Sequence, residues 1–360
     1  MSKRIESVDL LRGFTIAAMI LVNTPGTWSS VYSPLLHAEW HGLTPTDLIF
    51  PFFLFIVGIS IYFAYKNKSN DILVYKKIFI RSLKLIGLGL ILNLFLPYYP
   101  FIKDYETLRI LGVLQRIGIV FFISSILYLN FNWKYLITFC VLILLGYWIF
   151  LGFIPLSDGT LPTFDRALNN WSNYIDLHIL GAHMWQPDYD PEGIVSTLPS
   201  IVTCILGILV GKLLDEEASI QNLFSVSFVL LILGYLLDVL FPINKAIWSS
   251  SFVLATAGWA TLILSIIFYF RDVKKLQFGK YFKYIGINAI TIYFLSSFIS
   301  KSMYLLKIGD TNIHSFLYNA IFVYPFFSDK FSSLLYALTV VLFYLALGFF
   351  MYRKNIFIKV

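Results

Sequence analysis

The sequence predicts an all-α fold, a polytopic integral membrane bundle of about ten helices. Of its 360 residues, 58% are hydrophobic and only 13% are charged, whereas a soluble chain carries roughly 25% charged residues. The mean hydropathy is +0.78, and long apolar runs recur along the whole length. These observations exclude a soluble globular protein, a disordered or collagen-like chain and a disulfide-stabilised scaffold.

The predicted helices follow from the length of each apolar run. About 20 apolar residues cross the hydrocarbon layer as a helix, because only a helix satisfies its own backbone groups in lipid. Asn23, Pro25 and Gly26 interrupt the first run and no small-residue cleavage pattern follows, so we interpret it as a span rather than a signal peptide. An eleventh run, 313–327, is short and reaches Pro325, so we expect an interfacial helix there. The ten predicted spans are 10–27, 45–65, 79–97, 108–129, 135–154, 194–213, 222–241, 248–270, 284–303 and 333–352.

The basic residues predict how the bundle sits in the membrane. Ten spans place both termini on one side, and 18 of the 27 lysines and arginines fall in segments on that side, against seven on the other. Cytoplasmic segments carry such an excess, so we expect both termini in the cytoplasm and the protein in the cell inner (cytoplasmic) membrane. The 18 include Lys3, Arg4 and Lys359. The net charge of +7 then reflects topology in the lipid bilayer, and we expect no nucleic-acid partner.

The longest non-apolar stretch, 155–193, is expected to face outward. It is rich in Asp, His, Trp and Asn, and long ordered loops in compact domains usually carry function. We therefore expect it to cover the site of a single transmembrane domain, 1–360. Cys140 and Cys204 both lie inside apolar runs, which is typical of small core residues rather than of a disulfide or a metal pair.

The first outward connection, 28–47, carries two of the five histidines, His37 and His41, close to Glu39 and Asp47. Histidine is the usual general base near neutral pH and a carboxylate fixes its tautomer, so one histidine with Asp47 could deprotonate an amine or a hydroxyl. The alternative is a set of interfacial residues in an aromatic belt. Two histidines four residues apart also suit a metal, but Glu39 is at the wrong offset for H-E-x-x-H, and we expect no metal.

Two polar residues fall deep inside the predicted span 108–129. Gln115 and Arg116 are six or seven residues from its outer end, close to the middle of the membrane. An arginine at that depth needs a buried partner or a water-filled cavity, and its planar fork suits phosphate or carboxylate. The alternative is an internal ion pair between Arg116 and Asp47 or Asp238.

Further polar residues mark the two ends of the bundle. Asp9 and Arg12 are three residues apart at the start of the first span and could pair. The basic cluster 66–84 either sets the topology alone or also draws an anionic cofactor to the inner mouth. Asn23 and Asn288 lie inside predicted spans, where helix-to-helix hydrogen bonds and a site both account for them. Three carboxylates before the sixth span are either solvated or bind a cationic or hydroxyl-rich ligand: Asp188, Asp190 and Glu192.

Seven segments in order carry a family resemblance. They are SVDLLRG, LVNTPGTW, LLHAEWHGLTPTDLIFPFFLFIVG, RILGVLQRIG, YDPEGIVSTLPSI, FPINKAIWSSSF and RKNIFIKV. Together they run through nearly the entire chain, which resembles the bacterial relatives of heparan-α-glucosaminide N-acetyltransferase. The chain is similar to the membrane catalytic core of that family, without the large luminal domain and the preceding span of the lysosomal enzymes.

The resemblance implies a transmembrane acetyltransferase with acetyl-CoA as cosubstrate. In such an enzyme acetyl-CoA enters from the cytoplasm, and the amine of a glucosamine-type sugar on the extracytoplasmic side accepts the acetyl group. The family's active-site histidine matches His37, and its first-span asparagine matches Asn23. His41 stands where the lysosomal enzymes have an asparagine, which bears on the identity of the acceptor rather than on the chemistry.

The resemblance and the residues together predict three sets of site residues. His37 is expected to act as a base or a transient acyl carrier oriented by Asp47, with Asn23 or Gln115 stabilising the oxyanion. The predicted catalytic residues are therefore His37, Asp47 and Asn23. The predicted cofactor-binding residues are Arg116, Gln115, Arg12, Arg81 and Lys84. The predicted substrate-binding residues are His41, Glu39, Asp190, Glu192 and Lys245.

The alternative function is an amino-sugar or oligosaccharide transporter of the inner membrane, in which the 155–193 loop gates a polar cavity. Transporters with inverted repeats often have broken helices at matching places in their two halves, whereas the polar residues here concentrate in spans one, two and four. A purely structural subunit leaves His37, Asp47 and Arg116 unexplained. We also expect a homodimer, which is common among such membrane enzymes.

Overall fold

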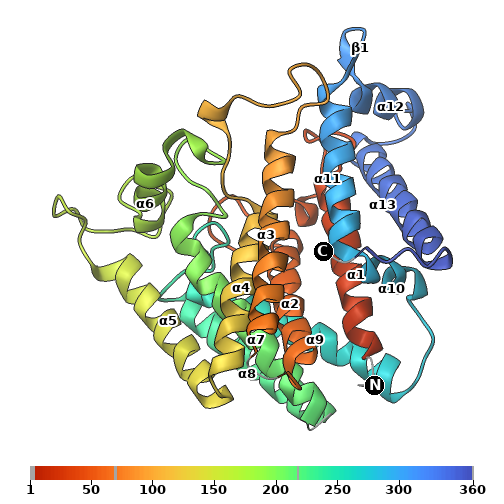
Figure 1. Ribbon diagram of the computed structural model, residues 1–360. Helices are drawn as coiled ribbons and strands as arrows, with labels where there is room; N and C mark the ends of the chain where they lie inside the picture. The colour runs from red at the N-terminus through yellow and green to blue at the C-terminus, as the bar shows by residue number, and fades with distance from the viewer. Residues whose placement is uncertain (1–4, 69–70, 217–218, 359–360) are drawn as a thin grey trace.

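The computed structural model describes residues 5–68, 71–216 and 219–358. Over these ranges the chain is an all-α membrane protein (Figure 1). The described residues also contain a short antiparallel ribbon, in which β1 (Lys307–Ile308) pairs with β2 (Thr311–Asn312). Lys3, Arg4 and Lys359, which entered the charge count above, lie outside the described residues.

Ten helices of at least 17 residues occur in the described ranges, and each overlaps one of the predicted spans. Three shorter α-helices lie between them. The long helices are α1 (Glu6–Asn23), α2 (Ile49–Tyr65), α3 (Ile72–Leu94), α4 (Val113–Asn130), α5 (Trp133–Phe153), α7 (Ile194–Glu216), α8 (Ile220–Asp238), α9 (Ser250–Phe268), α11 (Ala289–Leu305) and α13 (Asp329–Arg353). The short helices are α6 (Trp171–Leu180), α10 (Lys280–Ile287) and α12 (Ile313–Ile321).

Seven of the helices in the described ranges are long and apolar enough to cross a membrane, and the bent pair α10 and α11 would make an eighth. The long helices α1 and α3 are not among the seven because of their charges. Glu6, Asp9 and Arg12 lie in α1, and four lysines and arginines lie in α3. The class of all-α membrane protein is therefore confirmed, whereas ten spans and cytoplasmic termini stay predictions.

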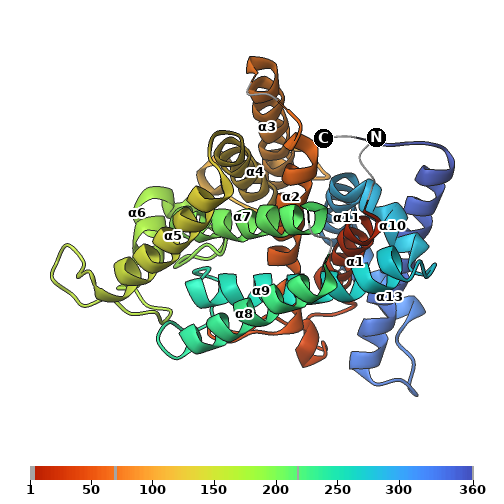
Figure 2. The same ribbon diagram turned by 90° about the horizontal axis from the view of Figure 1, so that it is seen from below.

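Helix α2 lies at the centre of the bundle, in contact with α1, α4, α7 and α9, and Figure 2 shows it between α7 and α1. It has no charged residue, which suits a helix surrounded by others. A Cβ at Gly58 would lie 1.9 Å from the Cys204 carbonyl oxygen, and one at Gly207 would lie 2.0 Å from the Phe55 carbonyl oxygen. These glycines let α2 and α7 pack backbone to backbone, which fixes the helix that follows the 28–47 loop.

Loops that the sequence predicts to face outward meet at one end of the bundle. The Trp40 indole N–H donates to the Phe164 carbonyl (2.9 Å), which joins the 28–47 and 155–193 loops. The Gly42 N–H donates to the Ile243 carbonyl (2.8 Å) in the turn before α9. In Figure 1, α6 and α12 lie toward the top, away from the start of α1 near the bottom. We call the end that carries these loops the outer end, and the opposite end the inner end.

The predicted span 108–129 begins later than expected. Helix α4 starts at Val113, because the segment before it is held in an extended form; the Asn93 side chain, for example, donates to the Arg109 carbonyl (2.8 Å). Arg116 therefore lies in the first turn of α4, near the outer end. The predicted start of this span at residue 108 was wrong, whereas the depth of Arg116 in the membrane stays a prediction.

The predicted span 284–303 is not one straight helix. Helices α10 and α11 meet at Asn288 with a bend of 85°. The Asn288 side chain donates to the Ile356 carbonyl (3.0 Å) and accepts from the Ile358 N–H (3.0 Å), so the C-terminal segment is bound at the break. The expected interfacial run 313–327 is helical over the nine residues of α12, which is too short to cross a membrane.

Candidate active site

His37 and Asp47 form a tight pair at the outer end. His37 Nδ1 lies 2.6 Å from Asp47 Oδ1, and the Asp47 side chain is only 1% exposed. The second carboxylate oxygen, Oδ2, accepts from the Ala38 N–H (3.1 Å), the Thr44 N–H (3.0 Å) and the Thr44 hydroxyl (2.9 Å). The predicted pair is thus present, and Asp47, in the turn before α2, holds the imidazole through its Nδ1 nitrogen. With the Nδ1 proton held by Asp47, Nε2 is the nitrogen that can accept a proton.

The His37 ring is 49% exposed because it borders a cavity of about 800 Å³. Helices α1, α2, α4 and α11 supply its floor, and the 28–47 loop, the 185–192 segment and the turn before α9 supply its walls. Of the predicted site residues, this cavity brings together Asn23, His37, Glu39, Asp47, Glu192 and Lys245.

Lys245, in the turn before α9, contacts His37 directly. Its ammonium nitrogen lies 3.0 Å from His37 Nε2, 3.1 Å from Nδ1 and 3.9 Å from Asp47 Oδ1. Burial lowers the pKa of Lys245, while the carboxylates of Asp47 and Glu192 oppose that shift. The predicted substrate-binding lysine is therefore a direct neighbour of the predicted base.

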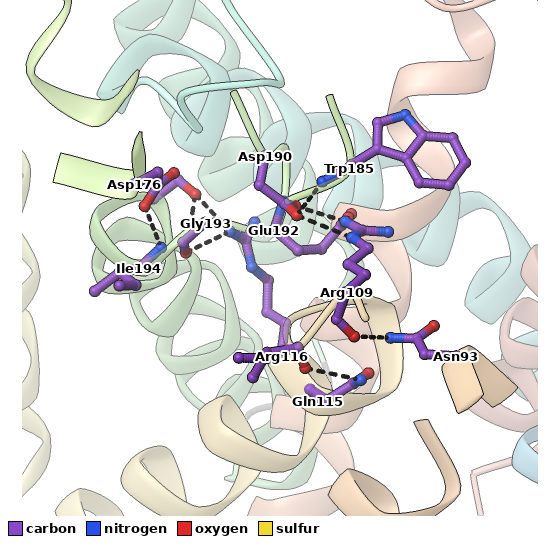
Figure 3. A network of polar contacts seen from close by, with 12 residues as sticks. Asn93, Arg109, Gln115, Arg116, Asp176, Trp185, Asp190, Glu192, Gly193 and Ile194 are labelled. Carbon is purple, nitrogen blue, oxygen red and sulfur yellow. Dashed lines mark hydrogen bonds and ion pairs between the residues drawn. The ribbon is translucent and has the colours of Figure 1, made fainter. Parts of the chain in front are cut away.

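Asp190 and Glu192 are not a solvated acidic loop, since they are 1% and 6% exposed. Figure 3 shows Arg109 between them: its guanidinium donates to Asp190 Oδ2 (2.9 Å) and Oδ1 (2.5 Å) and to Glu192 Oε2 (2.5 Å). Burial works to raise the pKa of Glu192, but the charges of Arg109, Arg116 and Lys245, together with the hydrogen bond from Arg109, outweigh burial and the pKa is lowered. Trp185 lies over the same guanidinium at 5.0 Å. Sequence reasoning missed Arg109, which holds both carboxylates and forms part of the cavity wall.

Arg116 lies below this network and is 1% exposed. It donates to the Gly193 carbonyl (3.1 Å) and the Ser196 hydroxyl (2.5 Å), and its guanidinium lies 5.1 Å from the Trp248 ring centre. Within the described residues it forms no ion pair with Asp47 or Asp238, the alternative that the sequence left open. Arg116 therefore braces the start of α7, and it does not line the outer cavity.

Asp176 on α6 completes the buried polar network in Figure 3. Its Oδ1 accepts from the Ile194 N–H (2.8 Å), and the side chain is 1% exposed. Burial raises the pKa of Asp176 to about 7, with a further contribution from the nearby Asp190 carboxylate. The charge of Arg116 opposes this shift. Asp176 is therefore a buried titratable group that the 155–193 loop places at the start of α7, outside the lining of the His37 cavity.

Gln115, which the sequence predicts as an oxyanion donor or cofactor ligand, points elsewhere. Its amide donates to the Ile110 carbonyl (3.1 Å) and borders a second cavity, of about 850 Å³, on the far side of Arg109 and Trp185. Asn23 ends α1 and lines the His37 cavity. Of the two predicted oxyanion donors, only Asn23 is near His37.

His41 is held by different partners from His37. Its Nε2 lies 2.9 Å from Asp165 Oδ1, and its Nδ1 lies 3.3 Å from the side-chain amide of Asn244. The residues from His37 to His41 are not helical, so the two imidazoles do not share a face. The chelating pair considered from the sequence is not formed.

A second predicted group of residues gathers at the inner end. A cavity of about 490 Å³ is lined by Arg12 and Arg81 together with Ser60 and the α10–α11 break. The predicted pair is present, with Arg12 Nη1 2.9 Å from Asp9 Oδ1, and Arg12 Nη2 donates to the Ser60 hydroxyl (2.8 Å). Lys84 is exposed on α3 and does not line this cavity. The inner cavity thus combines two arginines with largely apolar walls.

The two cavities follow each other along the same helix faces. On α2, Phe50 lines the outer cavity and Phe53 the inner one, and on α4 Val113 and Ile117 do the same. On α11, Tyr293 lines the outer cavity and Ile290 the inner one. Residues three or four apart are one turn apart, about 5.4 Å along the helix axis. About one helical turn of side chains therefore separates the two cavities.

These features define a multi-pass membrane protein with a histidine–carboxylate site at one end and an arginine-lined cavity at the other. Residues 4–237 match the family described as heparan-alpha-glucosaminide N-acetyltransferase, catalytic. The chain belongs to this family.

Two curated relatives agree with this assignment. The heparan-alpha-glucosaminide N-acetyltransferase of Mus musculus is 31% identical over 357 aligned positions, which cover 81% of this chain and 53% of the relative. The protein of the same name from Homo sapiens is 30% identical over 354 positions, which cover 81% of this chain and 52% of the relative. The chain thus spans about half the length of the curated relatives it matches.

Proposed function

We propose that the protein is a transmembrane acetyltransferase. It transfers an acetyl group from acetyl-CoA on the cytoplasmic side of the inner membrane to the amine of a glucosamine-type sugar on the opposite side. The observation that carries this proposal is the alignment of the outer and inner cavities on α2, α4 and α11. A donor bound at the inner end then needs to pass only one helical turn of side chains to reach His37.

The inner cavity suits the donor. Arg12 and Arg81 supply positive charge for the phosphates of coenzyme A. The apolar walls above them, including Val57 and Ile117, suit the slim pantetheine arm. This arrangement places the thioester toward the His37 cavity and leaves the nucleotide at the inner mouth.

The outer cavity suits the acceptor and the chemistry. Asp47 holds the Nδ1 proton of His37, so Nε2 is free to act as the base. The nitrogen of the acceptor amine attacks the thioester carbon, and Nε2 takes a proton from that amine. The C–S bond breaks, coenzyme A leaves as its thiolate, and the proton on His37 returns to the thiolate. Asn23 lines the cavity wall where its amide can donate to the oxyanion. Transfer through an acetyl-histidine at Nε2 uses the same contacts.

Reconstitution in liposomes tests the proposal. Radiolabelled acetyl-CoA is added outside and glucosamine is enclosed inside, and labelled N-acetylglucosamine is measured in the lumen. We expect product with the wild type and about 10³-fold less with His37→Ala. His178→Ala is the matched control, because His178 bonds within α6 to the Tyr174 carbonyl. Escape of unmodified glucosamine with no labelled product would overturn the acetyltransferase proposal in favour of a transporter.

A further inference from the structure

Lys245 belongs to a turn between α8 and α9 that the rest of the outer end holds in place. Asn244 is fully buried; its N–H donates to the Ser249 hydroxyl (2.9 Å), and its side-chain oxygen accepts from the Ile247 N–H (3.1 Å). The Ile247 carbonyl accepts from the Tyr147 hydroxyl (2.6 Å). The ammonium group of Lys245 is thus delivered from a rigid base rather than from a mobile loop.

The same turn contains a backbone conformation that ordinary residues seldom adopt. Trp248 has a φ of +50° and is fully buried. Its indole N–H donates to the Thr203 hydroxyl (3.1 Å), and its ring packs edge-on against Phe50 (5.3 Å between centroids). A bulky residue in the left-handed region costs free energy and persists where its surroundings demand it, often at functional sites. The turn therefore keeps this backbone conformation although it costs conformational free energy at Trp248. The conformation places Lys245 beside His37.

We propose that Lys245 is a positioning residue whose charge keeps the His37 imidazole unprotonated, while Asp47 sets the tautomer with its hydrogen on Nδ1. This role rests on the proposed function, in which His37 Nε2 is the base. Asp47 accepts the hydrogen on Nδ1. The Lys245 ammonium nitrogen lies 3.0 Å from Nε2 and 3.1 Å from Nδ1, and these nearly equal distances place it over the face of the ring, so the Nε2 lone pair stays open to the acceptor amine. A second proton on the ring would then meet a positive charge at hydrogen-bond distance. Lys245 thereby offsets Asp47, whose charge alone favours the imidazolium.

The other ionisable groups around His37 do not replace Lys245. Asp47 and Glu39, on the same loop, and Glu192, across the cavity, all favour a protonated ring. Arg109, the other cation on the cavity wall, is bound to Asp190 and Glu192. The phenols of Tyr189 and Tyr293 complete the ionisable lining. Lys245 is therefore the cation in direct contact with the imidazole among the described residues.

Carbethoxylation of histidine tests this role without substrate. Diethyl pyrocarbonate reacts with an unprotonated ring nitrogen, so the pH at which His37 reacts at half its maximal rate reports ring protonation. Mass spectrometry of the purified protein in detergent follows His37, with His178 as an internal reference. We expect the half-rate pH of His37 to rise by about one unit in Lys245→Met and Lys245→Gln, because a neighbouring cation is removed. Lys245→Arg keeps the charge and should stay close to the wild type.

Several outcomes would overturn the role of Lys245. An unchanged half-rate pH in both neutral variants would exclude an effect of its charge on His37. An equal shift in Lys245→Arg would show that shape, not charge, is responsible. Lys330→Met, at an exposed lysine at the start of α13, is the control and should leave the half-rate pH unchanged. The assay needs neither acetyl-CoA nor sugar, so it stands even if the liposome experiment finds no acetyl transfer.

Discussion

The outer and inner cavities share three helices but are built in different ways. In the outer cavity the polar groups bind each other: His37 lies 2.6 Å from Asp47 and 3.0 Å from Lys245. In the inner cavity most of the lining is apolar, and the Arg81 guanidinium lies 4.7 Å from the centre of the Phe121 ring. The outer cavity is a fixed arrangement of polar side chains, whereas the inner cavity has two arginines and mostly apolar walls.

This difference matches the separate tasks that the proposed function gives to the two ends. Proton transfer and acyl transfer require reacting atoms to be placed within a fraction of an ångström, so their side chains must be held by neighbours. Attraction of a polyanionic donor acts over a Debye length of roughly 8 Å and tolerates movement of the charged group. Substitutions at the outer end should therefore abolish chemistry, whereas those at the inner end should weaken donor binding.

The largest expected effect comes from Asp47→Asn. Oδ2 of Asp47 accepts three hydrogen bonds from Ala38 and Thr44, so the amide oxygen will occupy that position and the NH₂ will face His37. The imidazole must then carry its hydrogen on Nε2, which removes the lone pair that the base needs. We expect kcat/KM to fall about 10³-fold with KM for acetyl-CoA nearly unchanged. If only the KM for acetyl-CoA rises, Asp47 acts in donor binding. That result would contradict the assignment of chemistry to the outer cavity and donor binding to the inner one.

The second prediction concerns the stability of the outer end. Asp176 is buried and has a pKa of about 7, so the folded protein keeps its proton over a pH range in which the unfolded chain has lost it. Because the unfolded state binds fewer protons between pH 3.8 and about 7, stability falls as pH rises through this window. Asp176→Asn removes the titration and should unfold about 5 °C higher than the wild type at pH 8, from a gain of about 2 kcal/mol.

Thermal unfolding in detergent at pH 5 and pH 8 is the measurement. The advantage of Asp176→Asn should be small at pH 5 and larger at pH 8, because Asp176 is already neutral at the lower pH. Asp158→Asn is the matched control, because Asp158 lies in the same 155–193 loop and is exposed. An Asp176→Asn protein that is less stable at both pH values would show that the carboxylate is needed in its charged form.

Much of the fold could be predicted from the sequence, because in lipid each long apolar run has to be helical. The errors arose where distant residues decide how a helix begins or bends. Asn93 holds the segment before α4, and Ile356 and Ile358 bind Asn288 at the α10–α11 bend. No local pattern in either segment indicates these partners.

Separation along the sequence also decides which contacts of the site could be predicted. His37 and Asp47 are ten residues apart in one loop, so their pairing was predictable. Arg109 is 81 residues from Asp190, and its position at the outer end of the predicted span 108–129 made it look like one more outward basic residue. Lys245 is 208 residues from His37; the resemblance brought it to notice, but its contact with the imidazole required the folded chain.

At the inner end, Arg81→Ala should have a smaller effect than Asp47→Asn. Arg81 lines the inner cavity but makes no ion pair among the described residues, so its loss removes charge without leaving a buried partner unpaired. We expect KM for acetyl-CoA to rise about tenfold, which corresponds to about 1.4 kcal/mol, with kcat within about twofold. The difference from the wild type should shrink as salt is added. Lys77→Ala, one turn earlier on α3, is the control, and a large fall in kcat in Arg81→Ala would contradict the division of labour.

The smallest effect should come from Asp165→Asn, which repeats the Asp47 substitution on the other histidine of the same loop. His41 and Asp165 are 2.9 Å apart, as close as many functional pairs, but the Asp165 side chain is 75% exposed, whereas that of Asp47 is 1% exposed. Water replaces an exposed partner at little cost, so kcat/KM should stay within about twofold of the wild type. Steady-state kinetics of the two variants side by side measures the contrast. A loss in Asp165→Asn as large as in Asp47→Asn would mean that His41 takes part in the chemistry, and that burial is not what separates the two histidines.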